Sequence, residues 1–271
     1  MTSWISRPLP KKKIAPEPAP LFLLNQGTFT QKTSKPTLVT AFYDILDVIS
    51  FSLRKQKLKT FMETTESQLV VFTESQFADE LAALRNEKQE KTRVVVLEKS
   101  DWVSVSRYIP SLWTQQAKQD PEIRMNRTIE QYQFGYEKKE FLLKAITMNP
   151  FNSTDFVWIE PWQFESVPSV EFSGQNIPTD RMLVANPEPF TADDLASSYF
   201  KGKKRLDNRI LAGSAVQWKE YSKLYDVVMT LKLKLFSFVG DDSLMLHYVV
   251  IHKPNQFCLV KQDSLLSVVT T

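Results

Sequence analysis

Glycine is scarce in this chain of 271 residues: it has six, roughly a third of the usual frequency of ~7%. These glycines lie far apart in the sequence. Loops of the Walker or GxGxxG type need closely spaced glycines, because the backbone must approach the phosphate groups closely. The sequence therefore excludes nucleotide binding by a glycine-rich loop.

Cysteine and histidine are almost absent. The single cysteine, Cys258, excludes an intramolecular disulfide and with it the secreted disulfide scaffolds. One Cys and two His are too few for a zinc cluster of these residues. His247 and His252 fall in one predicted helix beside apolar neighbours, and no Gly-x-Ser-x-Gly turn is present, which disfavours a Ser/His/Asp hydrolase.

Long apolar runs and an excess of one charge are also missing. No stretch reaches eighteen apolar residues, and the only apolar run near the start, residues 21–24, is too short for a signal-peptide core. These absences predict a soluble, cytoplasmic protein without a transmembrane segment. A net charge of +3, from 34 basic and 31 acidic residues, is too mild for a protein that covers phosphate backbones. We therefore expect no nucleic-acid partner.

The chain divides into an arm, a domain and a tail. Residues 1–36 hold six of the fifteen prolines and three consecutive lysines from Lys11, which predicts an extended, solvated arm. A second interpretation is an arm that docks on a partner or an anionic surface through these lysines and Trp4. Hydrophobic residues make up 42% of the chain, enough for a sizeable core. We expect one folded domain over residues 37–265 and a short tail over residues 266–271.

Apolar runs alternate with amphipathic segments from residue 37 onward. The runs are rich in β-branched and aromatic residues, which predicts strands at residues 37–43, 68–73, 93–97, 155–159, 209–212 and 256–260. Apolar stripes at helical spacing lie around Leu81, Phe141 and Tyr221, and a last helix is predicted from Asp241 to just before Pro254. The alternation predicts an α/β fold with a mainly parallel sheet. The proline-rich segment 161–189 is predicted to be a long loop.

Acidic residues follow four of the predicted strands directly: Asp44, Glu74, Glu98 and Glu160. The carboxyl ends of parallel strands share one edge of a sheet, where ligands of open α/β sheets bind. Together with Asp241 and Asp242, these carboxylates suit a hard cation such as Mg²⁺ or Mn²⁺. In the other interpretation each acid occupies the first turn of a helix, where the helix dipole favours it.

Several segments resemble the HtrL/YibB-like family, which looks like a branch of the GT-A glycosyltransferases. The matching segments are TLVTAFYDI at 37–45, LVVFTE at 69–74, PE at 121–122, YEKKEFLLKAI at 136–146, NPFN at 149–152, FVWIE at 156–160, AG at 212–213 followed by Trp218, DDS at 241–243, and the closing run 255–260. The most specific is Asn-Pro-Phe followed by Phe-Val-Trp-Ile-Glu160, where the family reads Phe-Val-Trp-Ile-Asp. The matches run in order over most of residues 37–260.

The resemblance implies a single GT-A-like domain that transfers a sugar from a nucleotide sugar to a hydroxyl of a glycan or glycoconjugate, assisted by Mn²⁺ or Mg²⁺. It implies that Glu160 takes the metal-ligand position and that Asp242, or else Asp241, acts on the acceptor as general base or orienting group. The implied donor-side residues are Thr40, Phe42, Asp44, Arg54, Lys138 and Trp158, with Asp44 near the nucleoside and Arg54 and Lys138 near the diphosphate. The implied sugar or acceptor side consists of Trp162, Gly213 and Ser214.

The departures from the family pattern gather at the implied site. Glu160 replaces the family's Asp, and Pro161-Trp162 stand where a small residue and Gly are usual. Gly213-Ser214 replaces a turn richer in glycine, and Ser243 replaces Gln. This pattern also fits a catalytically degenerate protein of the same fold that binds a glycan, a nucleotide or a partner, with Trp158, Trp162 and Trp218 as platforms or as core aromatics.

Overall fold

The computed structural model describes residues 35–45, 49–122, 126–165, 172–191, 194 and 205–260. The predicted tail at residues 266–271 and nearly all of the predicted arm at residues 1–36 lie outside these ranges. None of the helices within them is both long and apolar enough to cross a membrane.

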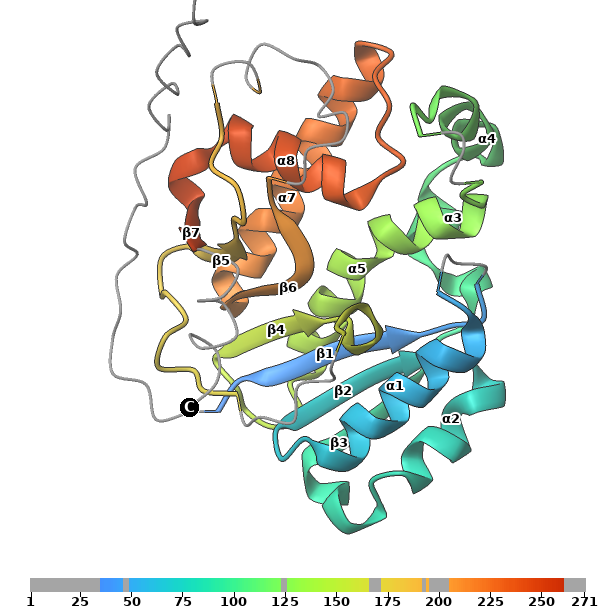
Figure 1. Cartoon of the computed structure of the whole chain (residues 1–271), viewed down its shortest axis with the longest axis vertical. Coiled ribbons are helices and arrows are strands. Elements are labelled where there is room, and N and C mark those ends of the chain that lie inside the picture. Colours follow the sequence, from blue (N-terminus) through green and yellow to red (C-terminus); the bar gives the residue numbers. More distant parts are fainter. Residues whose placement is uncertain are drawn as a thin grey trace, which may run out of the picture.

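Seven strands form one sheet in the order β3-β2-β1-β4-β6-β5-β7 (Figure 1). They are β1 (Thr37–Phe42), β2 (Gln68–Thr73), β3 (Thr92–Val96), β4 (Asp155–Ile159), β5 (Met182–Ala185), β6 (Asp207–Ser214) and β7 (Phe257–Val260). The strands pair in parallel except for β6, which runs antiparallel to both of its neighbours, β4 and β5. The predicted α/β fold with a mainly parallel central sheet is confirmed, and β5 corrects the prediction of a long loop at residues 161–189.

Helices cover both faces of the sheet (Figure 1). The α-helices are α1 (Phe51–Thr64), α2 (Ser75–Ala83), α3 (Val103–Arg107), α4 (Pro110–Gln119), α5 (Ile129–Met148), α7 (Ala215–Lys234) and α8 (Asp242–His252), and short 3₁₀ turns lie at Asn86–Lys91, Lys99–Asp101, Pro161–Gln163 and Pro254–Gln256. Alternate residues of β1 point to opposite faces, as the period of a strand requires. Leu38 and Phe42 join the core beneath α1 and α2, whereas Val39 and Ala41 join the core beneath α5, α7 and α8.

The crossing of α5 and α8 positions the functional site. A capping box of Thr128 and Gln131 begins α5, and the Asp241 side chain accepts a hydrogen bond of 2.8 Å from the Leu244 N–H at the start of α8. Gly135 of α5 faces Asp242 so closely that a Cβ atom at position 135 would lie 3.0 Å from the Asp242 Cβ. This close approach brings the next turn of α5, which carries Lys138, beside Asp242.

Candidate functional site

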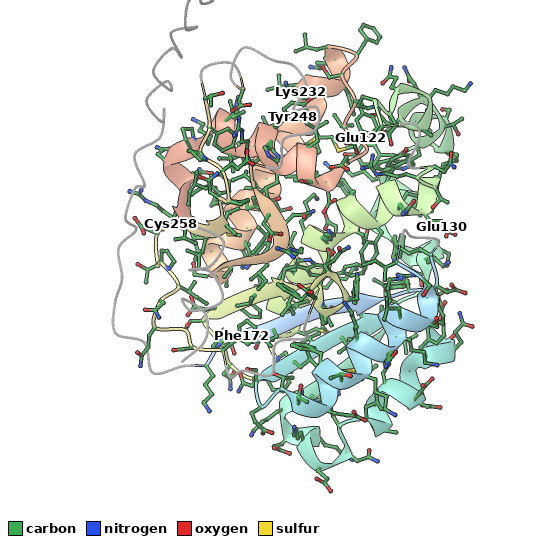
Figure 2. The ribbon with its side chains drawn as sticks, in the orientation of Figure 1. Glu122, Glu130, Phe172, Lys232, Tyr248 and Cys258 are labelled. Atoms are coloured by element: carbon green, nitrogen blue, oxygen red, sulfur yellow. The ribbon has the colours of Figure 1, made fainter. Side chains whose placement is uncertain are left out.

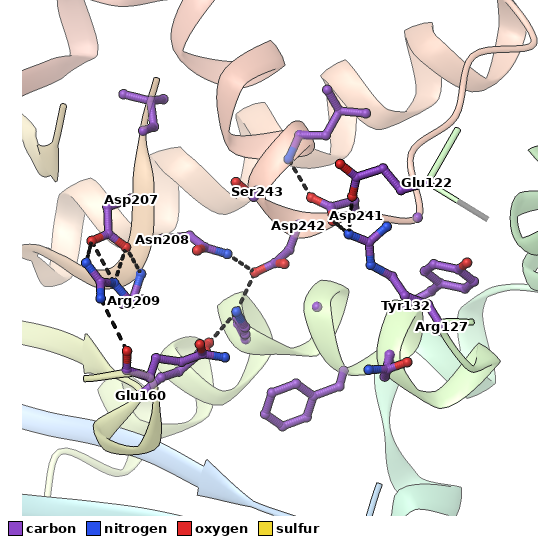
Figure 3. A pocket seen from close by; sticks show the side chains of 18 of the residues that line it. Glu122, Arg127, Tyr132, Glu160, Asp207, Asn208, Arg209, Asp241, Asp242 and Ser243 are labelled. Carbon is purple, nitrogen blue, oxygen red and sulfur yellow. Dashed lines mark hydrogen bonds and ion pairs between the residues drawn. The ribbon is translucent and has the colours of Figure 1, made fainter. Parts of the chain in front are cut away.

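A cavity of about 890 Å³ opens at the carboxyl end of β4. Its walls come from the segment after β4, from α5 and the residues before it, from the start of β6, and from the start of α8 (Figure 3). The place agrees with the rule that ligands of α/β sheets bind beyond the carboxyl ends of the parallel strands. The lining carries seven carboxylates but only four Lys or Arg side chains, so the cavity favours a ligand that is cationic or brings a cation.

Lys138, Glu160 and Asp242 form the centre of the cavity wall. The Lys138 ammonium contacts Glu160 Oε1 and Asp242 Oδ2 at the same time. The Asn208 amide donates to Asp242 Oδ2 over 2.7 Å, and the Trp158 indole N–H donates to Glu160 Oε1 over 3.2 Å (Figure 3). Two carboxylates from different elements therefore converge on a single cation; of the two hydrogen bonds, Figure 3 draws the one from Asn208 to Asp242.

Burial and charge set the protonation of this group. Burial raises the pKa of Glu160, and the nearby Lys138 ammonium offsets this only in part. Burial also acts to raise the pKa of Asp242, but Lys138 and the hydrogen bond from Asn208 outweigh it and lower that pKa below its usual value. The two carboxylates raise the pKa of Lys138 although its burial opposes this. Lys138 is therefore charged and Asp242 ionised at neutral pH.

A second charged group ties α8 to the segment before α5. The Arg127 guanidinium lies 2.6 Å from Glu122 and 3.1 Å from Asp241 (Figure 3). It also lies 2.9 Å from Asp120. The Tyr132 hydroxyl donates to Asp120 over 2.8 Å. Burial and the neighbouring Asp242 charge raise the pKa of Asp241, and Arg127 acts against them. Arg127 thus holds the amino end of α8 in place at the cavity wall.

The start of β6 supplies a third pair, Asp207 and Arg209. The Arg209 Nε atom lies 2.8 Å from both carboxylate oxygens of Asp207, and its guanidinium also donates to the Gln163 carbonyl over 3.2 Å. The sequence analysis does not place Asn208 or this pair in the site, because the strand predicted at residues 209–212 is expected to continue a parallel sheet, which would put its start at the opposite edge. Arg127 was missed as well, although Glu122, one of its partners, lies in a segment of the family resemblance.

Six of the implied site residues line the cavity: Arg54, Lys138, Glu160, Trp162, Asp241 and Asp242. Arg54 is buried and donates to the carbonyls of Tyr43 and Ile45, so it holds the chain as it leaves β1. Trp162 is only 2% exposed and packs edge-on against Phe42.

Four implied donor residues take other positions. Thr40, Phe42 and Trp158 are buried in their strands and are not among the lining residues. Trp158 reaches the site through its hydrogen bond to Glu160 and through the Lys138 ammonium, which lies 5.9 Å from the centroid of its ring. Asp44 lies at the same sheet edge but outside the lining, where its N–H donates to Glu74 over 3.0 Å and its carbonyl accepts from Lys99. Trp158 and Trp218, both nearly inaccessible, are core aromatics rather than exposed platforms.

Gly213 and Ser214 correct the prediction most clearly. They stand at the carboxyl end of β6, paired with Phe156 and Asp155 at the amino end of β4. Because β6 is antiparallel, this is the edge of the sheet opposite Glu160. At the edge beside Glu160, β6 contributes its first residues, Asp207 to Arg209, to the lining of the cavity.

The carboxylates expected along one sheet edge divide into two groups. Glu160 belongs to the cavity, whereas Glu74 and Glu98 face the start of α2 and Lys99, with Glu98 accepting from the Ser75 N–H over 2.9 Å. The described part of the chain contains no group of three or more His, Cys, Asp or Glu side chains arranged for a metal ion. What the structure brings together is the pair Glu160 and Asp242 around one cation.

His247 is a structural residue of this region. It is 2% exposed; its Nε2 atom accepts from the N–H groups of Arg205 and Leu206 over 3.1 and 3.2 Å, and its Nδ1 atom lies 2.6 Å from the Ser243 carbonyl. The neutral imidazole with its proton on Nδ1 satisfies all three contacts. Burial lowers the pKa of His247 below its usual value of 6.5.

We expect His247 to make stability depend on pH. Below pH 6.5 the unfolded chain takes up a proton that the folded imidazole resists, so the free energy of unfolding falls as the pH drops, by at most about 1.4 kcal/mol per pH unit. Urea unfolding between about pH 7.5 and 5.5 measures this slope. His247→Gln should flatten it, and His252→Gln, at an exposed position, should keep it. Equal slopes in the two variants would contradict this assignment.

No protein-family model and no curated protein matches the chain. The resemblance to the HtrL/YibB-like family therefore stays a prediction from the sequence. Among solved structures, the crystal structure of mouse xyloside xylosyltransferase 1 in its apo form is similar to this chain, with 10% sequence identity and a TM-score of 0.45 over 83% of this chain and 84% of that one.

Proposed function

We propose that the chain is a GT-A-like glycosyltransferase that moves a sugar from a nucleotide sugar to a hydroxyl of a glycan or glycoconjugate. The observation that carries the proposal is the convergence of Lys138, Glu160 and Asp242 in one cavity at the carboxyl end of β4. These are the residues for which the sequence resemblance implies a diphosphate neighbour, a metal ligand and an acceptor-side carboxylate. They come from three separate segments of the chain.

The size and charge of the cavity support such a donor. Its volume of about 890 Å³ lies within the range of roughly 300–1,000 Å³ that holds cofactor-sized ligands. A diphosphate on its own would meet the excess of carboxylates and be repelled. A divalent cation that enters with the diphosphate offsets part of its negative charge and so weakens the repulsion. The charge of the cavity therefore favours the predicted Mn²⁺ or Mg²⁺.

Glu160 and Asp242 fit a divalent ion of this kind. Magnesium in proteins is commonly held by one or two carboxylates and completed by water and substrate phosphates. Glu160 Oε1 and Asp242 Oδ2 already share one cation, the Lys138 ammonium, so they are the residues that would hold the ion, in competition with Lys138. When bound, such an ion neutralises the charge of the leaving diphosphate.

The second oxygen of Asp242 suits the acceptor. Lys138 and Asn208 both contact Oδ2, and no described residue donates to Oδ1. The ionised carboxylate can therefore receive the proton of an acceptor hydroxyl at Oδ1 while Oδ2 stays anchored. We assign Asp242 this role of general base or orienting group, with its anchors fixing the direction from which the acceptor approaches.

Calorimetric titration with UDP-sugars and GDP-sugars, with and without Mn²⁺, tests the proposal. We expect binding that requires Mn²⁺ and is lost in Glu160→Ala, because that variant removes one of the two carboxylates that share the cation. Glu98→Ala is the matched control, since Glu98 also follows a parallel strand but lies outside the cavity. Absence of nucleotide binding under every condition would contradict the proposal and favour an interaction protein on the same fold. Binding without transfer to any acceptor would favour the catalytically degenerate alternative.

A further inference from the structure

The carboxyl end of α7 carries an exposed apolar surface, which we call the α7 tip: Val227, Leu231, Leu235 and Phe236. Their exposed fractions are 52%, 44%, 71% and 81%. The first three follow a spacing of four residues and so share one side of the helix. The opposite side, with Tyr225, Val228 and Met229, is buried in the core. Most of the apolar surface of the tip therefore lies outside the packing of α7 against the domain.

The backbone conformation of Phe236 lowers the stability of the folded chain. Phe236 has a φ of 53°, its N–H donates to the Leu233 carbonyl, and the next N–H, of Ser237, donates to the Lys232 carbonyl. This pattern is the Schellman end of a helix, whose left-handed position usually holds glycine because a Cβ atom is strained there. Phe236 therefore carries two costs when the domain is surrounded by water. Its backbone is strained, and its aromatic ring is 81% exposed.

The charges around the tip indicate what covers it. Lys232 and Lys234 alternate with the apolar residues of the last turn, and residues 227–237 contain no Asp or Glu. Lys232 lies beside Tyr248, with its ammonium 3.8 Å from the ring centroid (Figure 2), and Lys234 is exposed. Leucines and an aromatic ring flanked by lysines are typical of helices that bind the interface of an anionic bilayer.

We propose that the α7 tip is a membrane-docking surface, on which Leu235 and Phe236 enter the interface of an anionic bilayer while Lys234 faces the lipid headgroups. The inference rests on the exposure, backbone strain and charge of the tip, and it stands without the proposed enzymatic function. Only a short connection separates Phe236 from Phe238, Gly240 and Asp241, which line the cavity. Docking at the tip therefore brings the cavity close to the lipid surface.

Sedimentation of the full chain with vesicles tests this inference. We expect binding to vesicles of phosphatidylcholine with phosphatidylserine, weaker binding to phosphatidylcholine alone, and loss of the difference at high salt. Phe236→Gly should weaken vesicle binding about tenfold, because the aromatic ring is no longer buried in lipid. The same variant should unfold at a higher urea concentration than the native chain, since glycine relieves the left-handed strain.

Val216→Asp is the control, because Val216 is 64% exposed but lies at the opposite end of α7; it should bind vesicles as the native chain does. Failure to bind either vesicle would overturn the inference. Binding that is unchanged in Phe236→Gly would also overturn it and assign the contact to another segment, such as the lysines from Lys11. A concentration-dependent dimer that Phe236→Gly abolishes would overturn it in favour of a second copy of the chain.

Discussion

Replacing Lys138 by methionine is expected to lower the free energy of unfolding by about 3 kcal/mol, because it leaves the buried Glu160 and the half-buried Asp242 as neighbouring carboxylates without their shared cation. Methionine keeps most of the length of the side chain, so the loss reflects charge more than volume. Burial already raises the pKa of Glu160, and without the ammonium the rise should increase. Urea unfolding near neutral pH, in the presence of a chelator, measures the effect.

Addition of Mn²⁺ should then stabilise the native chain and Lys138→Met to different extents. In Lys138→Met the two carboxylates no longer have a competing ammonium, so the ion should bind more tightly and restore a larger part of the stability than it adds to the native chain. This difference is read as the shift of the unfolding midpoint between chelator and Mn²⁺. A larger shift in the native chain than in the variant would contradict the assignment of Glu160 and Asp242 as the residues that share the ion.

Lys99→Met is the matched control for Lys138→Met. Lys99 also lies at the sheet edge near two acids, 3.8 Å from Glu74 and 3.4 Å from Glu130, but its side chain is 27% exposed against 13% for Lys138. Partly solvated pairs of this kind contribute about 1 kcal/mol or less. If both variants lost equal stability, the central role given to Lys138 would be wrong.

Asp242→Asn is expected to lower the rate of sugar transfer by a factor of about 10² to 10⁴, the range for removal of a general base. Asparagine preserves the shape of the side chain and a carbonyl oxygen that can still reach the ion beside Glu160, so the affinity for the nucleotide sugar should fall far less than in Glu160→Ala. Single-turnover transfer together with calorimetric titration of the donor separates the two effects. The readout that matters is a large loss in rate with a small loss in affinity.

Asp241→Asn provides the comparison, because Asp241 is the adjacent acid and faces Arg127 rather than Lys138. Its side chain caps α8, a role that asparagine also fills. A smaller loss in Asp241→Asn than in Asp242→Asn supports Asp242 as the acting carboxylate. The reverse order would transfer the role to Asp241, and unchanged transfer in both variants would place the base elsewhere.

The strands that the sequence predicted best are those buried on both faces. β1, β2 and β4 are continuous apolar runs, and a run of that kind has few other structural solutions in a chain of this length. β5 was not predicted because it has only four residues and lies within a proline-rich segment. The direction of β6 could not be predicted, because an apolar run has the same composition whether the strand pairs in parallel or antiparallel with its neighbours. The site residues Asp207, Asn208 and Arg209 were missed for that reason.

Charged residues on buried helix faces were the other obstacle. The buried side of α1 begins with Arg54 and continues with Leu58, Phe61 and Met62. An arginine at the first position of an apolar stripe hides the pattern, although its guanidinium is satisfied by the carbonyls of Tyr43 and Ile45. Arg127, which lies in the segment before α5, was missed for another reason: Asp120 and Glu122 are close to it in the sequence, but Asp241, which connects it to α8, is distant. Pairing of this kind depends on how the helices pack.

The contact between Gly135 and Asp242 limits how this protein can change over evolutionary time. A Cβ atom at position 135 would lie 3.0 Å from the Cβ atom of Asp242, so a substitution there requires Asp242 to shift by a few tenths of an ångström relative to α5. Helix propensity alone favours alanine over glycine by about 1 kcal/mol, so without the contact to Asp242 the change from glycine to alanine would stabilise α5. Relatives that keep Lys138 and Asp242 together should therefore retain glycine at this position, whereas relatives that have lost the pair are free to accept alanine.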